Sequence, residues 1–362
     1  MNILFLCKRF YTGSDLIKER FGRLYHFPRH WADCGHRVTV VAADYKSMKS
    51  THLQEPNLHI VAAPFFKPWA GFGAKIRESV KANPPDIVIA SCDSHFGYIG
   101  MRLAQKLNVP FVFDLYHNYE DFGSNRVPGM RWMYRKALSN AALVVCDSER
   151  LAERIGTYSQ NTHIAPQATD NTVFRALDRD DCCEKLGLDK NHRNLVYVGN
   201  VDSRFDENTL IRTVELLAES GHQPRLIIAG PGLSDLHSNH PLVHYLGRLP
   251  QEKIPLVIGC ADLCLIPYRR TLLAETCNPC KLSEYIACGR PIIASNISNI
   301  AEYLPRSGYL CYEPENVDSL LASISAQLAR PILEEQGTAL LWENVGAEYL
   351  IELEKLTTLA AR

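Results

Sequence analysis

CKLSEYIACGRPIIAS, residues 280–295, contains one complete helix-to-strand unit of the chain. Its first nine residues are predicted to form a helix, and Gly289 is a residue that commonly ends one. Pro291 then begins a short run, PIIAS, that is almost wholly apolar. Such runs are typical of strands that are buried on both faces of a parallel sheet. The stretch therefore predicts a helix packed against such a sheet.

The same alternation of strands and helices continues outward from this stretch in two series. A polar, irregular connection at residues 165–181 separates the two series. The predicted strands are residues 2–7, 37–43, 86–91, 110–115 and 142–148 in the first series, and 194–199, 225–232, 243–247, 261–267 and 290–295 in the second. This pattern predicts an α/β fold with two Rossmann-like, doubly wound parallel-sheet domains that face a cleft. We place the domains at residues 1–170 and 171–338, followed by a helical segment at 339–362.

The composition of the 362 residues, 46% hydrophobic and 22% charged, is that of a globular protein with room for two cores. No apolar run approaches the ~18 residues of a membrane span, and the apolar run in the opening MNILFLCKRF is too short for a signal peptide. We therefore expect a cytoplasmic protein. Lys and Arg outnumber Asp and Glu by 22 to 15 in residues 1–175, and are outnumbered by 25 to 17 in residues 176–362. The positive first half suggests an anionic partner, and a difference in surface charge without a partner is the alternative.

Twelve cysteines are scattered along the chain, and two of them form the motif Cys277-Asn-Pro-Cys280. A structural zinc site needs four ligands, and neither a second suitable pair nor a His-x3–5-His motif accompanies this one. A thioredoxin-like redox pair would follow the first strand of a small domain. We therefore predict reduced thiols here, and a protein that needs no metal or other cofactor.

Familiar cofactor and catalytic motifs are missing from the places where they would be expected. No G-x-G-x-x-G follows the first predicted strand, which argues against NAD- or FAD-dependent enzymes. The sequence also lacks a P-loop, a G-x-S-x-G nucleophile elbow and a compact nucleic-acid-binding motif. We therefore expect a ligand at the carboxyl ends of the strands and no nucleic-acid partner.

Several motifs, taken in their order along the chain, resemble those of one large enzyme family. They are DLYHN (114–118), IAPQATDNTVF (164–174), LIIAGPG (226–232), VHYLGRLP (243–250) and NPCKLSEYIACGRPIIAS (278–295). The family is that of the GT-B glycosyltransferases with an E-x7-E motif (family 4, group 1), here in a P-x-K-x-x-E-Y variant. The resemblance covers nearly the whole chain. It implies an acceptor-binding domain at 1–170, a nucleotide-sugar-binding domain at 171–338, and a helix at 339–362 that crosses back onto the first domain.

The helix that begins near Asn278 is the expected site for a diphosphate. With Asn278 as N-cap and Pro279 in the first turn, free backbone N–H groups and the positive end of the helix dipole would face the anion. Lys281 adds a charge there, and Glu284 lies on the same face at i+3. The resemblance implies that Glu284 binds ribose hydroxyls. An exposed Lys–Glu pair on an ordinary helix is the alternative.

Further donor-side residues follow from the resemblance. The loop after the first strand of the second domain contains Gly199 and Arg204, and Arg204 is the candidate for a second phosphate-binding cation. A solvated arginine beside its acidic neighbours is the alternative. Glu302 resembles a family glutamate near the donor, with an ordinary helix-start glutamate as the alternative. Thr276 stands where the first glutamate of E-x7-E belongs, and this departure bears on sugar binding and stereochemistry.

Acceptor-side residues are expected at the ends of strands in the first domain. Asp114 and His117 lie at or just past the end of the strand PFVFDL and, with Lys281, are the candidates for catalysis. A buried strand-end carboxylate is the alternative for Asp114. The candidates in the loop after the first strand, where a glycine lets the backbone approach a ligand, are Arg9, Gly13 and Asp15.

Two basic aromatic segments, residues 17–31 and 126–138, combine cations with Trp, Tyr, Phe and Met. This composition suits peripheral contact with an anionic membrane surface, at the inner face of the membrane. An amphipathic core helix with a solvated basic face is the alternative.

Together these expectations predict a cytoplasmic, hexosyltransferase-like and retaining glycosyltransferase. It would move a sugar from a nucleotide-diphosphate sugar to a glycan or lipid-linked acceptor, in bacterial-type polysaccharide or glycoconjugate synthesis. Fixed cations and a helix dipole would stabilise the departing diphosphate, so no metal is required. Two alternatives stay open: a UDP-sugar 2-epimerase on the same fold, and a non-catalytic nucleotide-sugar or glycan-binding protein.

Overall fold

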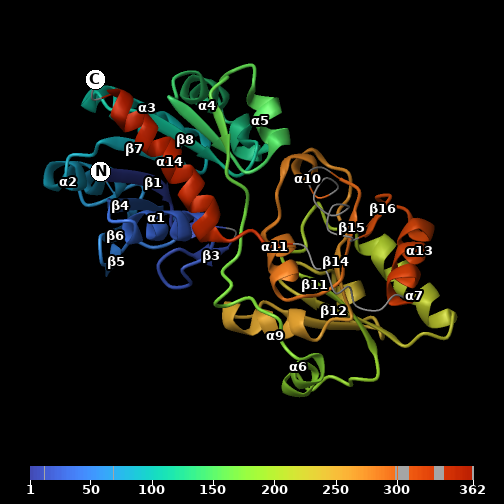
Figure 1. The fold of residues 1–362 in the computed structure, drawn as a ribbon. Coiled ribbons are helices and arrows are strands. Elements are labelled where there is room, and N and C mark those ends of the chain that lie inside the picture. Colours follow the sequence, from blue (N-terminus) through green and yellow to red (C-terminus); the bar gives the residue numbers. More distant parts are fainter. Residues whose placement is uncertain (12, 68, 298–299, 301–309, 330–337, 361–362) are drawn as a thin grey trace. The chain divides into compact units, whose positions relative to one another are not determined.

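A computed structural model describes residues 1–360 of the protein, except for residues 12, 68, 298–299, 301–309 and 330–337. The chain forms two compact units (Figure 1). Unit 1 consists of Met1–Gln167 and Trp342–Arg362, and unit 2 consists of Ala168–Leu341. The chain thus changes unit after Gln167 and after Leu341, whereas the sequence analysis placed its domain boundaries after 170 and 338.

Unit 1 is built on an eight-stranded sheet in the order β10-β9-β8-β7-β1-β4-β6-β5. Neighbouring strands run parallel, except for the antiparallel edge pair β5–β6. The strands are β1 (Asn2–Lys8), β4 (Arg37–Asp44), β5 (Thr51–Glu55), β6 (Leu58–Pro64), β7 (Ile87–Ser91), β8 (Phe111–Leu115), β9 (Leu143–Cys146) and β10 (Thr162–Ile164). β2 (Phe10–Tyr11) and β3 (Ser14–Asp15) form a separate small hairpin.

Helices connect the parallel strands of unit 1, except that β5 lies between β4 and β6 in the chain. They are α1 (Arg23–Asp33), α2 (Phe72–Ala82), α3 (Ser94–Leu107), α4 (Met130–Ser139) and α5 (Glu149–Ile155), with 3-10 turns η1 (Tyr119–Asp121) and η2 (Gly123–Arg126). All five residues of β7 and of β8 are buried, which explains why their sequences are continuous apolar runs rather than alternating ones. The predicted doubly wound α/β architecture is therefore confirmed for this unit.

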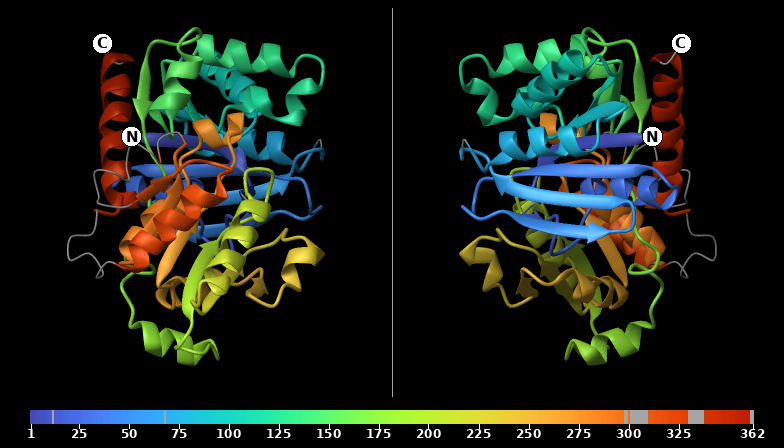
Figure 2. Two further views of the ribbon diagram at one scale, coloured as in Figure 1. Left: turned by 90° about the vertical axis from the view of Figure 1, so that its right-hand side faces the viewer. Right: turned by 90° about the vertical axis from the view of Figure 1, so that its left-hand side faces the viewer.

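The final described helix, α14 (Trp342–Ala360), belongs to unit 1 although the whole of unit 2 precedes it in the sequence. It packs along α1 (Figures 1 and 2). The Trp31 indole N–H donates to the Gly346 carbonyl oxygen at 3.2 Å, and the Tyr349 ring lies edge-on to Phe27 and Trp31. This aromatic contact confirms the expected crossover of the C-terminal helix onto the first domain.

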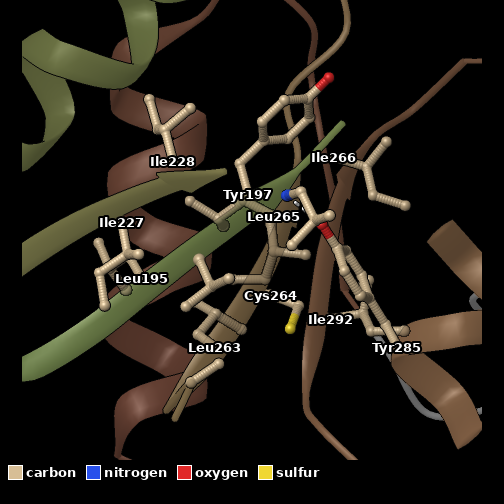
Figure 3. Close-up of a cluster of buried hydrophobic side chains, with 14 of the residues drawn as sticks. Leu195, Tyr197, Ile227, Ile228, Leu263, Cys264, Leu265, Ile266, Tyr285 and Ile292 are labelled. Atoms are coloured by element: carbon tan, nitrogen blue, oxygen red, sulfur yellow. Dashed lines mark hydrogen bonds between the residues drawn. The ribbon is translucent and has the colours of Figure 1, made fainter. Parts of the chain in front are cut away.

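Unit 2 contains a six-stranded, fully parallel sheet in the order β13-β12-β11-β14-β15-β16. Its strands are β11 (Arg193–Val198), β12 (Pro224–Ala229), β13 (Val243–Gly247), β14 (Leu263–Ile266), β15 (Ile292–Ser295) and β16 (Leu310–Tyr312). Its helices are α6 (Arg179–Lys185), α7 (Glu207–Glu219), α8 (Asp235–Ser238), α9 (Ile254–Gly259), α10 (Leu272–Thr276), α11 (Cys280–Ala287) and α13 (Val317–Leu328), and η3 is Gln251–Lys253. The central strands supply a core of Leu, Ile and Val (Figure 3).

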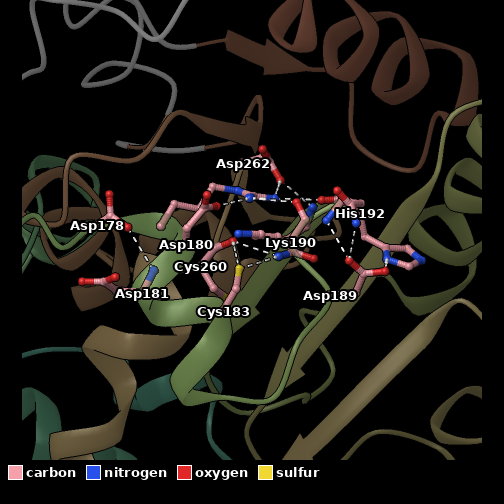
Figure 4. Close-up of polar contacts among 12 residues, drawn as sticks. Asp178, Asp180, Asp181, Cys183, Asp189, Lys190, His192, Cys260 and Asp262 are labelled. Atoms are coloured by element: carbon pink, nitrogen blue, oxygen red, sulfur yellow. Dashed lines mark hydrogen bonds and ion pairs between the residues drawn. The ribbon is translucent and has the colours of Figure 1, made fainter.

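The segment expected to be an irregular linker ends in an anchored helix. Asp178 accepts a hydrogen bond from the Asp181 N–H at 2.9 Å and so caps the start of α6. Arg179 pairs with Asp262 at 2.7 Å, and the same carboxylate accepts from the Asn194 N–H at 2.7 Å, at the beginning of β11 (Figure 4). The linker reading was therefore wrong from Asp178 onward, because these contacts fix the segment to unit 2.

The sequence analysis also missed the edge hairpin of β5 and β6. Its turn contains Pro56 and Asn57, and Asn57 adopts a left-handed φ of 57°. β5 alternates in exposure, as antiparallel edge strands do, and so lacks the continuous apolar run by which the predicted strands were found. No helix in the described ranges is both long and apolar enough to cross a membrane.

Candidate active site

The candidate site lies at the carboxyl edge of the unit 2 sheet, where parallel strands leave their loops. The loops after β11 and β12 meet through backbone atoms, since the Gly199 N–H donates to the Ala229 carbonyl at 2.8 Å. A Cβ on Gly230 would lie 1.9 Å from the Gly199 carbonyl oxygen, and Gly230 has a φ of +146°. Only glycine fits there, so the two loops are held at a separation that a side chain would not permit.

Helix α11 begins one residue later than the sequence analysis expected. Its N-cap is Pro279, which adopts an extended conformation. The assignment of Asn278 as N-cap was therefore wrong. Tyr285 holds the helix against the sheet, because the Val198 N–H at the end of β11 donates to its hydroxyl at 2.9 Å (Figure 3).

Lys281, in the first turn of α11, lies between two tyrosines. Its ammonium donates to the hydroxyls of Tyr197 at 2.9 Å and Tyr268 at 3.0 Å. The same nitrogen lies 4.1 Å and 5.0 Å from the centres of the two rings. Lys281 is only 9% exposed, so it is not the solvated lysine of the alternative reading.

The two tyrosines also connect Lys281 to the loop after β11. The Tyr197 hydroxyl donates to the Asn200 carbonyl oxygen at 2.8 Å, and a Cβ on Gly199 would lie 2.7 Å from the Lys281 ammonium. The ammonium therefore sits against the backbone of this loop. Figure 3 shows Tyr197 pointing away from the aliphatic side chains around it.

The sequence analysis missed both tyrosines. Tyr197 is the single aromatic residue in the strand NLVYV, and Tyr268 lies two residues after the end of β14, the strand that pairs with β11 in the sheet. Polar-tipped side chains at strand ends mark sites in this class of fold, and that signal was available.

Burial dominates the electrostatics of Lys281 and Glu284. Loss of solvent, followed by repulsion from Arg204, lowers the pKa of Lys281 to about 7, against the attraction of Asp202 and Glu284. Loss of solvent also raises the pKa of Glu284 to about 7, although Lys281 acts in the opposite direction. Glu284 is 8% exposed, and no group within the described part of the chain donates a hydrogen bond to its carboxylate.

Arg204 joins the same cluster from the loop after β11. Its guanidinium lies 5.3 Å from the centre of the Tyr268 ring, so Tyr268 contacts both cations of the cluster. Arg204 also pairs with Asp202 at 2.6 Å, which is the arrangement that the alternative reading proposed. The structure thus brings Gly199, Arg204, Lys281 and Glu284 to one edge of the sheet. Glu302 lies outside the described residues.

Asp114 occupies a different environment in unit 1. It is fully buried at the end of β8, where Arg23 pairs with it at 2.6 Å and the Ser91 hydroxyl donates to it at 2.6 Å. The Arg23 guanidinium also donates to the Ala165 carbonyl at 3.0 Å. These contacts are those of the buried strand-end carboxylate considered for Asp114, and they leave it no exposed surface for a substrate.

The first-strand loop of unit 1 forms a second buried network. Arg9 pairs with Asp15 at 2.7 Å and with Asp44 at 2.9 Å, and all three side chains are buried. Gly13 has a left-handed φ of 90° and is exposed, which fits the conformational freedom expected of it. His117 is half-buried after β8, with the rings of Tyr116 and Phe122 beside it.

The two segments for which membrane contact was expected differ from each other in exposure. Helix α1, which overlaps residues 17–31, buries Tyr25, Phe27 and Trp31, as in the alternative of an amphipathic core helix. Helix α4, which overlaps residues 126–138, exposes Trp132 by 54%.

Two known family models match this chain, one in each unit. Residues 192–330 match the family model described as "Glycosyl transferases group 1", and residues 23–165 match that of the "Glycosyl transferase 4-like domain". Both are glycosyltransferase domains. The resemblance to glycosyltransferase domains is thereby confirmed.

Individual relatives of these glycosyltransferase domains are distant. The α-monoglucosyldiacylglycerol synthase of Streptococcus pneumoniae is 22% identical over 268 residues, which are 66% of this chain and 59% of that protein. The chain therefore spans less than two thirds of this curated relative. Among solved structures, a sucrose-phosphate synthase from Thermosynechococcus elongatus aligns with a TM-score of 0.77 at 18% identity, over 99% of both chains. HepE of Anabaena, in complex with UDP and glucose, aligns with a TM-score of 0.73 at 16% identity, over 98% of this chain and 99% of that chain. These likenesses confirm the GT-B fold.

The segment before α11 contains Thr276, which stands where the resemblance expected the first glutamate of E-x7-E. The Thr276 hydroxyl donates to the Leu272 carbonyl at 3.2 Å within α10, and Cys277 is buried with its thiol 3.5 Å from the Ala274 carbonyl. Cys277 and Cys280 form no disulfide bond with each other, and Cys280 is half-buried. Over the residues described, no three His, Cys, Asp or Glu side chains are grouped so that they could hold a metal ion.

Proposed function

We propose that this protein transfers a sugar from a nucleoside-diphosphate sugar to a glycan or lipid-linked acceptor, in polysaccharide or glycoconjugate synthesis. The observation that carries the proposal is the pair formed by Lys281 and Glu284 at the start of α11. An ammonium buried between two tyrosines, and a buried carboxylate to which no described residue donates a hydrogen bond, are costly arrangements in a ligand-free protein. A bound anion and bound hydroxyl groups would offset both costs.

In this proposal, Glu284 binds the ribose of the donor. A carboxylate accepts hydrogen bonds from two vicinal hydroxyls, and such charge-assisted bonds are strong in a partly dry environment. The raised pKa of Glu284 has burial as its cause, and ribose hydroxyls would lower this pKa by stabilising the charged form. The residue is thus suited to exchange a proton for a nucleotide near neutral pH.

Lys281 and Arg204 bind the diphosphate in this proposal, near Gly199 and the start of α11. Negative charge grows on the diphosphate as the sugar leaves, so fixed cations stabilise the transition state more than the bound donor. Arg204 would exchange part of its contact with Asp202 for phosphate, to which arginine binds in a bidentate manner. No step of the proposed reaction involves a metal ion. Asn278, which directly precedes the N-cap Pro279, would contribute to donor binding through its backbone.

The acceptor side of the proposal rests on His117, with Gly13 as a backbone contact. His117 is half-buried in the loop after β8, and we propose that it contacts the acceptor or the transferred sugar. Asp114, Arg9 and Asp15 act indirectly in this proposal, because their buried ion pairs fix the loops at the strand ends. A hexose transferred with retention is the expected outcome. The names of HepE with UDP and glucose, and of the glucosyldiacylglycerol synthase, support a uridine donor and a lipid acceptor.

Thermal-shift measurements and calorimetry with UDP-, GDP- and dTDP-sugars test the proposal, because a ligand that binds the folded state raises its melting temperature. We expect one nucleotide class to bind, and turnover to require an acceptor. Release of UDP without acceptor, with solvent deuterium at C2 of the sugar, would instead identify an epimerase. Binding without turnover across glycan and lipid acceptors would identify a binding protein, and no binding of any nucleotide sugar would refute both.

A further inference from the structure

Unit 1 exposes a group of large apolar side chains on two loops that the donor site does not use. Trp69 is 90% exposed, Phe66 80% and Met48 71%, and Tyr45 is also exposed. They come from the loop after β4 and the loop after β6. Exposed apolar side chains are normal when single, but a contiguous group of them indicates a contact with another surface.

These loops leave the sheet beside one another, and we call their residues 45–49, 65–67 and 69 the loop surface. β4 and β6 are neighbouring parallel strands whose ends are in register, at Asp44 and Pro64. The Phe65 N–H donates to the Asp44 carbonyl at 3.0 Å. The Tyr45 ring stacks on Phe65 at 5.0 Å and contacts Phe66 at 6.0 Å. Ring contacts thus connect the two loops.

The loop surface is strongly positive. It contains Lys46, Lys49 and Lys67, and no ion pair involves any of these three side chains within the described ranges. Asp44, which directly precedes the loop after β4, is paired with Arg9 at 2.9 Å, and Asp93 is paired with Lys8 at 2.6 Å. The Lys46 ammonium lies 4.1 Å from the centre of the Phe10 ring, whereas its backbone N–H donates to the Asp44 carboxylate at 2.7 Å.

From this combination we infer that the loop surface docks on an anionic lipid membrane. Tryptophan and tyrosine favour the membrane–water interface, where their apolar rings and polar edges are both satisfied. Lysines beside them are attracted to the negative surface of the leaflet. The surface fits a carbohydrate poorly, because residues 45–51 and 65–71 contain no Asp, Glu, Asn or Gln to bind sugar hydroxyls.

The loop surface lies outside residues 17–31 and 126–138, the two segments for which the sequence suggested membrane contact. The aromatic residues of α1 are buried, and α4 offers one exposed tryptophan, Trp132. The loop surface lies instead at the carboxyl edge of the unit 1 sheet, the edge at which the proposed function expects the acceptor. A lipid-linked acceptor would then be met where the protein touches the bilayer, and this last step alone rests on the proposed function.

Co-sedimentation of the purified chain with phosphatidylcholine vesicles, with and without phosphatidylglycerol, tests the inference. We expect binding that needs the anionic lipid and weakens with salt. The double variant Phe66→Ser/Trp69→Ser should bind at least about tenfold more weakly. Replacing Lys46, Lys49 and Lys67 by glutamate should lose about fivefold or more for each lysine.

The matched control is Trp132→Ser, which removes an exposed tryptophan from α4 and should leave vesicle binding unchanged. Nucleotide binding, measured by calorimetry, should be unchanged in every one of these variants. The vesicle assay and the calorimetry therefore test the membrane inference and the proposed donor site independently. The inference is overturned if the parent ignores anionic vesicles, if the loop variants bind like the parent, or if binding follows Trp132. It is also overturned if the loop variants instead abolish self-association or binding to a soluble glycan.

Discussion

Replacing Lys281 by methionine should make the ligand-free protein more stable, although it removes a cation from the proposed donor site. Burial, with repulsion from Arg204, lowers the pKa of Lys281 from 10.5 to about 7. One pKa unit corresponds to about 1.4 kcal/mol, so the folded state holds this ammonium at a cost of about 4 kcal/mol at pH 7. Methionine removes the charge and keeps an unbranched side chain of similar length.

The substitution also removes two hydrogen bonds. Those from the Lys281 ammonium to the hydroxyls of Tyr197 and Tyr268 are worth about 1 kcal/mol each. We therefore expect the free energy of unfolding of Lys281→Met at pH 7 to exceed that of the parent by about 2 kcal/mol. Sites built for ligand binding commonly carry such a stability cost.

The stability difference between Lys281→Met and the parent should change with pH, which a change in packing alone would not cause. Between pH 7 and 10.5 the unfolded chain binds more protons at Lys281 than the folded protein does, so the stability of the parent rises with pH in that window. The advantage of Lys281→Met should therefore shrink above pH 7 and disappear by about pH 10.

Urea unfolding of both proteins from about pH 6 to pH 10 measures this difference, with Lys190→Met as the control on an exposed lysine. Turnover should fall more than donor affinity, because the cation acts on charge that develops in the transition state. A variant less stable than the parent at pH 7, with a difference that does not change with pH, would refute the reasoning. The ammonium would then be a stabilising structural group rather than a cation held ready for a ligand.

Three further predictions concern the same edge of unit 2. Glu284→Gln should weaken nucleotide binding by about ten- to a hundredfold through lost charge-assisted hydrogen bonds, and unchanged affinity by calorimetry would remove Glu284 from the site. Gly199→Ala should destabilise the protein by about 1–3 kcal/mol and lower turnover, because its φ is +135° and its Cβ would meet the Lys281 ammonium. Gly221→Ala is its control, with a positive φ and open space around the Cβ, and equal turnover in both would contradict the close approach. Replacing Cys277 and Cys280 together by serine should leave donor affinity nearly unchanged, and stoichiometric zinc in the parent that this double variant loses would contradict a metal-free motif.

Much of the fold was predictable because parallel strands leave a simple trace in the sequence. NILFLC became β1 and DIVIAS became β7, since strands covered on both faces need apolar residues at every position. The edge hairpin β5–β6 escaped prediction because THLQE alternates and includes His52 and Gln54. α6 escaped for another reason: its anchor, the contact of Arg179 with Asp262, joins residues 83 positions apart.

The candidate site was predictable in its residue types and not in its environment. The spacing placed Lys281 and Glu284 on one face of a helix, and both do lie on α11. The burial of Lys281 was not predictable, because it depends on Tyr197 in β11 and on Tyr268 in the loop after β14. Asp114 shows the opposite case, since its position at a strand end suggested a site, whereas Arg23, 91 residues away, makes it a buried partner.

The place of α14 in unit 1 has a consequence for how the protein is made. Its contacts with Phe27, Trp31 and the rest of α1 join residues more than 300 positions apart, as in the bond from Trp31 to Gly346. A ribosome therefore completes unit 2 before it delivers the helix that covers α1. Until then the nascent unit 1 shows an aromatic face to chaperones and proteases. Any product cut short before Trp342 keeps that face uncovered, so the cell can tell it from a finished chain.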